Sequence, residues 1–287
     1  MKLLRVGAPG AEKPAMIDPD GIMRDLSGHV IDIAGETLSP RGIAMLRQFD
    51  PYSLPELAPG RRIGPCIGGV GKIVCVGLNY TDHALELGMP LPEEPILFGK
   101  AVSSLAGPHD NIAKPRDATK LDYELELAVI IGSRAKYVSR GQAMAHVAGF
   151  AVFNDISERG FQTERGGQWI KGKSHDGFGP LGPWLVTADE MPDVSDLALT
   201  LRVNGAVRQQ STTQRMIFDV PALVSYISQF MTLEPGDIIP TGTPPGVAMG
   251  MATPGWLEPG DLIEAEIEGL GQQSARIIPA DTLAGVA

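Results

Sequence analysis

Two glutamates, Glu124 and Glu126, are separated by one residue in the apolar run YELELAVIIG at 123–132. In a β-strand, residues two apart point to the same face, so these carboxylates are expected side by side, with Leu125 and Leu127 on the other face. Adjacent carboxylates repel each other, and a bound divalent cation relieves that repulsion. A half-exposed strand with a polar, solvent-facing side is the alternative, and this segment alone favours neither interpretation.

Asp155 follows the apolar segment GFAVFN at 149–154, where a predicted strand meets a loop. Together with the two glutamates it forms an all-oxygen set of possible ligands with no His or Cys nearby. Hard oxygen ligands favour Mg²⁺, Mn²⁺ or Ca²⁺ over zinc. Acidic triplets are common, so the spacing by itself is weak evidence for a metal site.

The segment NYTDHALELG at 79–88 holds His83 and Glu86 three residues apart. One helical turn would place both on a common face. A carboxylate beside an imidazole orients the ring and raises its basicity, as the activation of water requires. A chance pair on an exposed helix is the alternative that this segment alone favours.

A third candidate region is the Gly-rich loop WIKGKSHDGFGPLGPW at 169–184, which contains Lys171, Lys173 and His175. A lysine held in such a loop can face a substrate oxygen and stabilise developing negative charge. Local composition does not choose between the two lysines. His175 fits a structural hydrogen-bonding role as well as a functional one.

Short strands joined by turns are the elements expected to position these residues. Gly (35) and Pro (24) together make up about a fifth of the 287 residues, without a period, which favours a β-rich fold. Residues 1–66 are predicted to form a small β-rich domain with a helix beginning at Ser39. Residues 67–287 are predicted to form the larger, catalytic domain, because the stretch 53–71 is rich in Pro and Gly.

Within the larger part, alternation and turn residues predict strands at 72–80, 123–132 and 149–157. Asn204-Gly205 is a strong hairpin turn between two further strands. Apolar spacing predicts a helix at 220–233. Two EPGD segments, at 234–237 and 258–261, are expected to be turns that lead into strands.

The composition excludes several classes of protein. A net charge of −10 argues against a nucleic-acid partner, although a local cluster or a metal still permits an anionic small molecule. Cys66 and Cys75 supply neither a disulfide framework nor a zinc motif. The first ten residues, MKLLRVGAPG, lack the apolar segment typical of a signal peptide, and no run of about eighteen apolar residues occurs. A cytoplasmic enzyme without a membrane partner is therefore expected.

Taken together and in order, six motifs resemble those of the fumarylacetoacetate hydrolase family, over roughly residues 72–278. These motifs are VGLNYTDH with the following Glu, ILFGK, DYELELAVIIG, FNDISERGFQ, KGKSHDGFGPLGPW and TGTPPGVAMG. The resemblance implies an α+β, β-rich fold, a mixed β-sheet roll, usually packed as a homodimer. It also implies a soluble enzyme with Mg²⁺ (or Mn²⁺) as cofactor and a small diketo acid as substrate.

The resemblance further assigns roles to individual residues. The implied metal ligands are Glu124, Glu126 and Asp155. The implied catalytic residues are His83, Glu86 and Lys173, which settles the choice against Lys171. The implied substrate-binding residues are Lys100, Arg159, Gln162 and Thr243. Asp82 aligns with an extra ligand of the family's namesake, but here His83 follows it directly, so its role stays open. His175 replaces an aromatic residue common in relatives, and its role is open too.

The implied activity is hydrolysis of the C3–C4 bond of a 2,4-diketo acid, a hydrolase reaction on a carbon–carbon bond in a ketonic substance. His83, oriented by Glu86, would activate the attacking water, and Lys173 would help to stabilise the enolate that leaves as pyruvate. The N-terminal run 1–35 resembles bacterial members that convert 2,4-diketo-3-deoxy-L-rhamnonate or L-fuconate to pyruvate and L-lactate. Acylpyruvate hydrolysis, oxaloacetate decarboxylation and hydroxydienedioate isomerisation are alternatives, and a non-enzymatic metal-binding or scaffold protein is a remote one.

Overall fold

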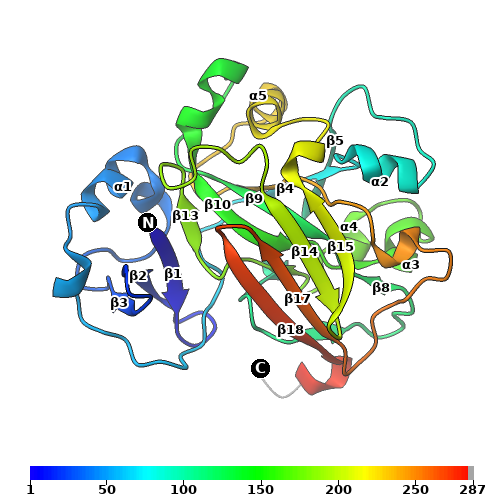
Figure 1. The fold of residues 1–287 in the computed structure, drawn as a ribbon, viewed down its shortest axis with the longest axis horizontal. Helices are drawn as coiled ribbons and strands as arrows, with labels where there is room; N and C mark the ends of the chain where they lie inside the picture. Colours follow the sequence, from blue (N-terminus) through cyan, green and yellow to red (C-terminus); the bar gives the residue numbers. More distant parts are fainter. Residues whose placement is uncertain (284–287) are drawn as a thin grey trace.

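The computed structural model describes residues 1–283, and its largest element is a nine-stranded mixed sheet (Figure 1). From edge to edge this sheet contains β3 (Met23–Asp25), β2 (Lys13–Ile17), β1 (Lys2–Val6), β13 (Leu185–Thr187), β10 (Val147–Asn154), β9 (Leu125–Ile131), β16 (Ile238–Pro240), β4 (Ile73–Gly77) and β5 (Ile96–Lys100). All neighbouring pairs are antiparallel except β16 and β4, which are parallel.

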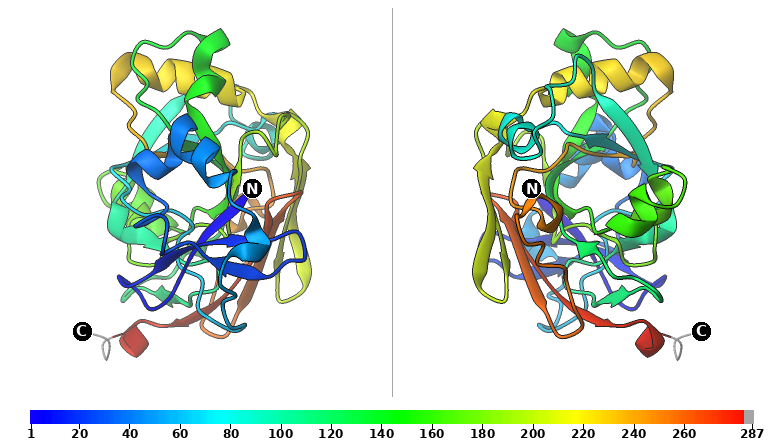
Figure 2. Two further views of the ribbon diagram at one scale, coloured as in Figure 1. Left: turned by 90° about the vertical axis from the view of Figure 1, so that its left-hand side faces the viewer. Right: turned by 90° about the vertical axis from the view of Figure 1, so that its right-hand side faces the viewer.

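A five-stranded sheet lies against this one and appears on one side of the molecule in the turned views (Figure 2). Its order is β15 (Ala206–Thr212), β14 (Ala198–Val203), β17 (Leu262–Ile267), β18 (Gly271–Pro279) and β7 (Ile112–Lys114). Two small ladders pair β11 (Ser157–Glu158) with β8 (Leu121–Asp122), and β12 (Gly179–Pro180) with β6 (Leu105–Ala106).

The helices are few and short. The α-helices are α1 (Pro40–Leu46), α2 (Thr81–Glu86), α3 (Arg159–Thr163), α4 (Ile170–Lys173) and α5 (Val220–Phe230). The 3₁₀ turns are η1 (Gly35–Leu38), η2 (Pro51–Ser53), η3 (Val102–Ser104), η4 (Arg140–His146), η5 (Thr213–Arg215), η6 (Ala248–Gly250) and η7 (Ala280–Leu283). The predicted β-rich α+β fold is confirmed. Among residues 1–283, no helix is both long and apolar enough to cross a lipid bilayer.

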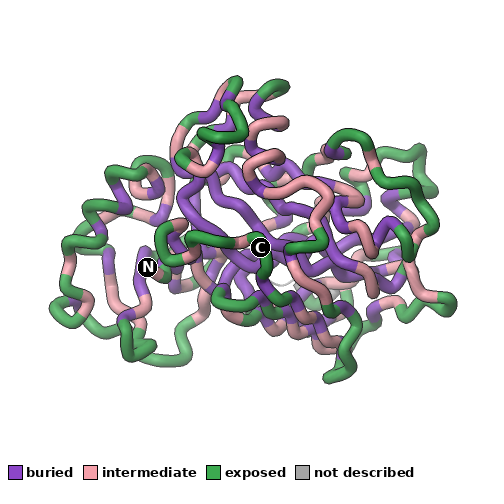
Figure 3. Tube along the Cα trace, turned by 45° about the horizontal axis from the view of Figure 1, so that its top comes forward, coloured by how far each residue is buried: buried purple, intermediate pink, exposed green. Residues whose placement is uncertain are grey.

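Strand β9 lies near the middle of the large sheet and is buried along its whole length. Figure 3 shows that buried segments run through the middle of the molecule and that exposed ones lie around its edge. The odd-numbered residues of β9, such as Leu125 and Leu127, belong to the core shared with the five-stranded sheet. Ala128 and Ile130, on the opposite face, belong to a second core that includes residues of α1. Glu126 shares that second face because residues two apart in a strand point the same way. The predicted alternation of this strand is therefore confirmed.

The first 66 residues continue the large sheet, because β1 pairs with β13 at Leu3 and Leu185. Leu4, Val6 and Ala15 form a small hydrophobic cluster of their own. Other residues of this segment belong to the second core, which also includes residues of β4, β9 and β10. The division of the chain after residue 66 stays a prediction.

Several local predictions are confirmed in detail. The Ser39 side chain caps α1 by accepting a hydrogen bond from the Gly42 backbone N–H at 3.0 Å, and Pro40 is the first helical residue. Asn204 and Gly205 have φ of 53° and 78° and join β14 to β15, as their sequence predicts. The predicted helix at 220–233 is present as α5, which ends at Phe230.

Candidate active site

The pairing of β9 with β10 brings the three predicted metal ligands together. Phe153 pairs with Glu126, and the Asp155 backbone N–H donates to the Glu124 carbonyl at 2.8 Å. One carboxylate oxygen from each of Glu124, Glu126 and Asp155 lies within 4.8 Å of the other two. The three residues are 7%, 2% and 0% exposed. A polar, solvent-facing strand, the alternative for the glutamate pair, is therefore wrong.

Burial and mutual repulsion set the charge of this cluster. Burial raises the pKa of the Glu126 carboxyl well above its usual value, and the negative charges of Asp155 and Glu124 raise it further. Burial also opposes ionisation of Glu124, but the cations Arg159 and Lys173 outweigh it and hold that pKa well below its usual range. Three convergent carboxyl groups offer the oxygen ligands that a hard divalent cation prefers.

Lys173 ends α4 and places its ammonium group against the cluster. Its Nζ donates to Asp155 Oδ2 at 2.7 Å and also to Glu124 Oε2. Although burial lowers the pKa of Lys173, the charges of Asp155 and Glu124 raise it overall, to about 12. Lys171 instead lies at the surface and donates to the Arg165 carbonyl. The geometry thus brings Lys173, and not Lys171, to the carboxylates.

Helix α3 contributes Arg159 and Gln162, both buried. The Arg159 guanidinium donates to Glu124 Oε1 at 2.7 Å, to Gln162 Oε1 at 3.0 Å and to Asp122 Oδ2 at 2.9 Å. Burial disfavours its charge, but Glu124 and Asp122 raise the pKa of Arg159 above its usual value. Arg159 therefore holds one predicted metal ligand in place and orients one predicted substrate-binding residue.

Asp122 is a site residue that the sequence reasoning missed. Its side chain is fully buried and, besides Arg159, it accepts hydrogen bonds from the backbone N–H groups of Ala248 and Met249 at 2.7 and 3.1 Å. The alternation of acidic residues at 122, 124 and 126 in DYELEL was the available signal. Asp122 ties α3 and the segment around residue 248 to the base of β9.

The dyad forms as predicted on α2. His83 Nδ1 lies 2.9 Å from Glu86 Oε2, and the His83 side chain is only 6% exposed. Glu86 Oε1 accepts a second hydrogen bond, from the Gly246 backbone N–H at 2.9 Å. His83 is buried although Glu86 is exposed, and the Gly246 backbone holds Glu86 beside the ring, so the alternative of a chance pair on an exposed helix is not favoured.

Two residues with open roles lie outside the carboxylate cluster. Asp82 accepts hydrogen bonds from the Ser211 hydroxyl at 2.9 Å and from the His83 backbone N–H at 3.1 Å. His175 packs between Phe161 and Phe178, with ring centroids 5.6 and 5.1 Å away. Burial lowers the pKa of His175, which favours its neutral form. Both contacts are those of residues that support the fold.

Of the remaining predicted substrate contacts, Thr243 lines the cavity and Lys100 does not. Lys100 is buried beneath the cluster, where Nζ donates to Asp155 Oδ1 at 2.5 Å and to the Ile156 carbonyl at 3.2 Å. In this structure its partner is therefore a predicted metal ligand, and not the space a substrate would fill. Thr243 Oγ1 donates to the Leu125 carbonyl at 2.9 Å and accepts from Gln209 Nε2 at 2.8 Å.

A cavity of about 180 Å³ opens onto these side chains. Its polar lining consists of His83, Glu124, Glu126, Arg159, Gln162, Thr163, Lys173 and Thr243. Its apolar lining consists of Val76, Gly77, Leu78, Leu87, Met89, Ile96, Phe98, Trp169 and Met249. His83, Glu124, Glu126 and Lys173, which come from separate parts of the chain, thus line one cavity.

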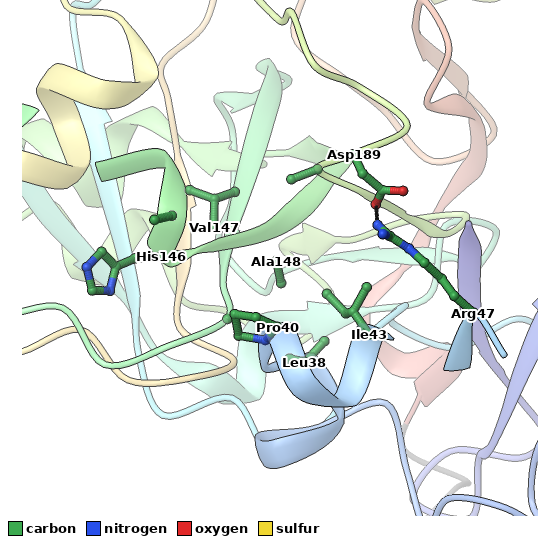
Figure 4. Close-up of a pocket in the computed structure, with 11 residues that line it drawn as sticks. Leu38, Pro40, Ile43, Arg47, His146, Val147, Ala148 and Asp189 are labelled. Carbon is green, nitrogen blue, oxygen red and sulfur yellow. Dashed lines mark ion pairs between the residues drawn. The ribbon is translucent and has the colours of Figure 1, made fainter. Parts of the chain in front are cut away.

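Another cavity, of about 240 Å³, lies between α1 and the start of β10 (Figure 4). Its lining is largely apolar, and its charged residues Arg47 and Asp189 form an ion pair with each other. It contains no group of three possible metal ligands, and the Glu124–Glu126–Asp155 group is the one such group among residues 1–283. The cavity at the carboxylate cluster is therefore the candidate active site.

Known proteins are similar to this chain over nearly its whole length. A protein of Burkholderia multivorans, whose name assigns it provisionally to the hydrolases, is 54% identical over 274 residues, which cover 95% of this chain and 97% of that protein. The solved structure of a fumarylacetoacetate hydrolase from Exiguobacterium antarcticum is 36% identical with a TM-score of 0.84, covering 97% of this chain and 99% of that one.

A 2-hydroxyhepta-2,4-diene-1,7-dioate isomerase from Mycobacterium marinum is 35% identical with a TM-score of 0.73, covering 97% of this chain and 98% of that one. The similar structures thus include both hydrolases and isomerases of one superfamily. The sequence pattern of the fumarylacetoacetate (FAA) hydrolase C-terminal family matches residues 72–278, most of the chain. The chain therefore belongs to the fumarylacetoacetate hydrolase family.

Proposed function

We propose that this protein is a Mg²⁺-dependent hydrolase that cleaves the C3–C4 bond of a 2,4-diketo acid and releases pyruvate. The observation that supports the proposal is the shared cavity, which is lined by His83, by Lys173 and by the two glutamates of the carboxylate cluster. Glu86 pairs with His83 from outside the cavity lining. A water-activating pair beside an anion-stabilising centre is what hydrolysis through an enolate needs.

Glu124, Glu126 and Asp155 would hold the Mg²⁺, and Mn²⁺ would suit the same oxygens. When bound, the ion supplies Lewis-acid stabilisation of the negative charge that develops on the pyruvate half of the substrate. Lys173, kept protonated by Asp155 and Glu124, adds a second positive charge at the same place. Arg159 keeps Glu124 ionised and oriented toward the cluster.

His83 is the general base in this scheme. When its Nδ1–H donates to Glu86, the lone pair on Nε2 is available to a water molecule. That water loses a proton to Nε2 and adds to the C4 carbonyl. The C3–C4 bond then breaks, its electron pair passes to C3 as an enolate, and C4 becomes the second carboxylic acid. Protonation of C3 completes pyruvate, so one water is consumed for each diketo acid.

For the substrate we propose 2,4-diketo-3-deoxy-L-rhamnonate or L-fuconate, which would give pyruvate and L-lactate. Gln162 is the candidate partner for the C5 hydroxyl, because it lines the cavity and its Oε1 is already used by Arg159, which leaves Nε2 to donate. A site that hydrogen-bonds a hydroxyl discriminates strongly against an analogue without it.

Steady-state kinetics on the 5-hydroxy diketo acid and on acetylpyruvate test this proposal, with pyruvate and lactate measured separately. We expect a higher kcat/KM for the hydroxylated compound. Acetylpyruvate turned over at equal or higher kcat/KM would contradict the sugar-acid assignment and leave the hydrolysis itself standing. We also expect a cytoplasmic homodimer, and light scattering of the purified protein tests the oligomeric state.

A second candidate is isomerisation of a hydroxydienedioate. Similar solved structures with 35% and 34% identity carry isomerase names, and one of those names specifies a 1,7-dioate. An isomerase moves a double bond and needs no attacking water. Isomerisation of such a dioate changes its ultraviolet absorbance and releases no pyruvate, whereas hydrolysis of a 2,4-diketo acid releases pyruvate. The two assays, run in parallel, separate the two candidates.

A further inference from the structure

The cavity has an apolar wall formed by Ile96, Phe98 and Trp169. Ile96 and Phe98 are two residues apart on β5, so they point to the same face of the sheet. The Trp169 ring packs edge-on against Phe98, with centroids 5.2 Å apart. The three side chains therefore form one continuous surface.

Gly77 makes room for this wall. It pairs with Ile96 across β4 and β5, and a Cβ added there would lie 3.1 Å from the Trp169 ring and 3.6 Å from Ile96 Cγ2. The indole thus lies directly over the backbone of β4. The wall is built into the sheet, and its position is set by backbone as well as by side chains.

The wall begins at the reacting centre and ends at the mouth of the cavity. Lys173 Nζ lies 5.0 Å from the centroid of the Phe98 ring, so Phe98 adjoins the carboxylate cluster. Ile96, at the far end, is 37% exposed, and Met89, which also lines the cavity, is 48% exposed. A substrate whose carboxylate and 2-keto end lies at the cluster would extend its other end along this surface.

Cations in the cavity lining are confined to the cluster. Among the described residues, the lysines and arginines that line it are Lys173 and Arg159, and both are already paired with buried carboxylates. A second carboxylate at the far end of a substrate would lie against Ile96, Phe98 and Trp169 with no opposite charge. Placing a charge against an apolar surface without a partner is unfavourable.

We propose that this wall selects 2,4-diketo monoacids whose far end is apolar and rejects diacids of similar length. The inference rests on the proposed hydrolysis and narrows its substrate class. The lactoyl end of the proposed sugar-acid substrate is uncharged and finishes in a methyl group, which would lie on the wall, while its C5 hydroxyl is the group assigned to Gln162. Trp169 is the residue on which this selection depends most, because it closes the wall over Gly77.

The test compares pentanoylpyruvate with succinylpyruvate, which carries a carboxylate on an acyl chain of similar length. With the Mg²⁺-loaded full chain, we expect kcat/KM to favour pentanoylpyruvate by on the order of tenfold or more. Trp169→Arg should lower that preference by about tenfold or reverse it. The matched control is Ile170→Arg, because Ile170 is 49% exposed and does not line the cavity, and it should keep the wild-type preference.

Calorimetry provides a second readout that does not depend on turnover. The ligands are the monoacid 2-oxooctanoate and the diacid 2-oxoheptanedioate, which lack the 4-keto group and cannot be cleaved. The wild type and Ile170→Arg should bind the monoacid more tightly than the diacid, and Trp169→Arg should not. Tighter monoacid binding without pyruvate release from any acylpyruvate would overturn the proposed hydrolysis but support the selection of monoacids by the wall. Equal or tighter binding of the diacid by the wild type, or an unchanged preference for the monoacid in Trp169→Arg, would overturn the proposed selection by the wall.

Discussion

Glu86 links its own helix to a loop more than 150 residues later in the chain, because Oε2 pairs with His83 Nδ1 while Oε1 accepts the Gly246 backbone N–H. The carboxylate also fits against Gly250, where an added Cβ would lie within 3.0 Å of all three of its terminal atoms. Glu86 therefore fixes both the orientation of the imidazole and the position of α2 over the cavity.

This arrangement predicts unequal effects within the dyad. His83→Ala should lower hydrolysis by about two to four powers of ten, the usual contribution of a general base. Glu86→Ala should lower it less, since Glu86 orients the ring and does not itself transfer the proton. Stopped assays of pyruvate release measure both variants.

The chemistry of water attack supplies an internal control. Decarboxylation of oxaloacetate passes through the same enolate but needs no attacking water, so any such activity should fall less than hydrolysis in His83→Ala. Equal losses in the two reactions would count against a water-activating role for His83.

The carboxylate cluster predicts a metal-dependent gain in stability. Glu126→Ala should abolish activity and weaken Mg²⁺ binding in calorimetry, because the two remaining carboxylates compete poorly with water for a hard cation. Mg²⁺ should raise the Tm of the wild type, since a ligand that binds only the folded state stabilises it, but not that of the variant.

Glu126→Gln is the matched variant for this test, because it keeps the shape of the side chain and removes the charge. Its fold should persist without metal, since the substitution removes a buried, repelled carboxylate. Undiminished Mg²⁺ affinity in either variant would show that the metal assignment is wrong.

Gln209 connects the five-stranded sheet to the site by hydrogen bonds. It is the buried residue of an otherwise more exposed part of β15, where its Oε1 accepts the Leu125 backbone N–H at 2.9 Å and its Nε2 donates to Thr243 Oγ1. Gln209→Leu leaves that buried N–H without a partner, which should cost about 1–3 kcal/mol in the free energy of unfolding.

The Gln209→Leu variant should also have a lower kcat/KM, because both hydrogen-bond partners of Gln209 belong to the site. Leu125 lies between Glu124 and Glu126, and Thr243 lines the cavity. Urea unfolding and kcat/KM measure the two effects. Gln210→Leu is the control, since Gln210 is exposed, and similar losses in both variants would contradict a positioning role for Gln209.

Much of the site could be predicted from the sequence because its residues follow local rules. Glu126 lies on β9 and Glu124 directly precedes that strand, and both follow the two-residue period of extended backbone. His83 and Glu86 follow the period of the α2 helix. Such spacing places side chains on one face, whatever lies opposite that face.

Burial and long-range contacts could not be predicted from the sequence, because they depend on packing between distant segments. A strand with alternating polar and apolar residues is compatible with one solvent-exposed face. Only the packing of α1 and the neighbouring strands shows that β9 is buried on both faces. Lys100 is predicted to meet substrate, and in the structure it donates to Asp155, a partner 55 residues away that no local spacing indicates. Gln209 carried no local signal, since its partners lie 34 and 84 residues away.

Gly172, which precedes Lys173 in α4, packs closely against the segment that carries Arg159. A Cβ at this position would lie 2.3 Å from the Glu158 carbonyl oxygen and 2.6 Å from the Gln162 backbone nitrogen. Both neighbours are backbone atoms of the segment that carries Arg159, so they cannot rotate away as a flexible side chain would. Gly172→Ala should therefore push α4 away from α3 and lower the free energy of unfolding by about 1–3 kcal/mol.

The same displacement should move the Lys173 ammonium from Asp155 and Glu124, so kcat should fall by more than the loss of folded protein explains. Gly141→Ala is the matched control, because no atom lies within 4 Å of a Cβ added at Gly141. Circular dichroism melts and kcat at a temperature where both variants are fully folded separate the two effects. A Gly172→Ala protein with wild-type kcat and an unchanged melt would show that close packing of α4 on α3 does not position Lys173.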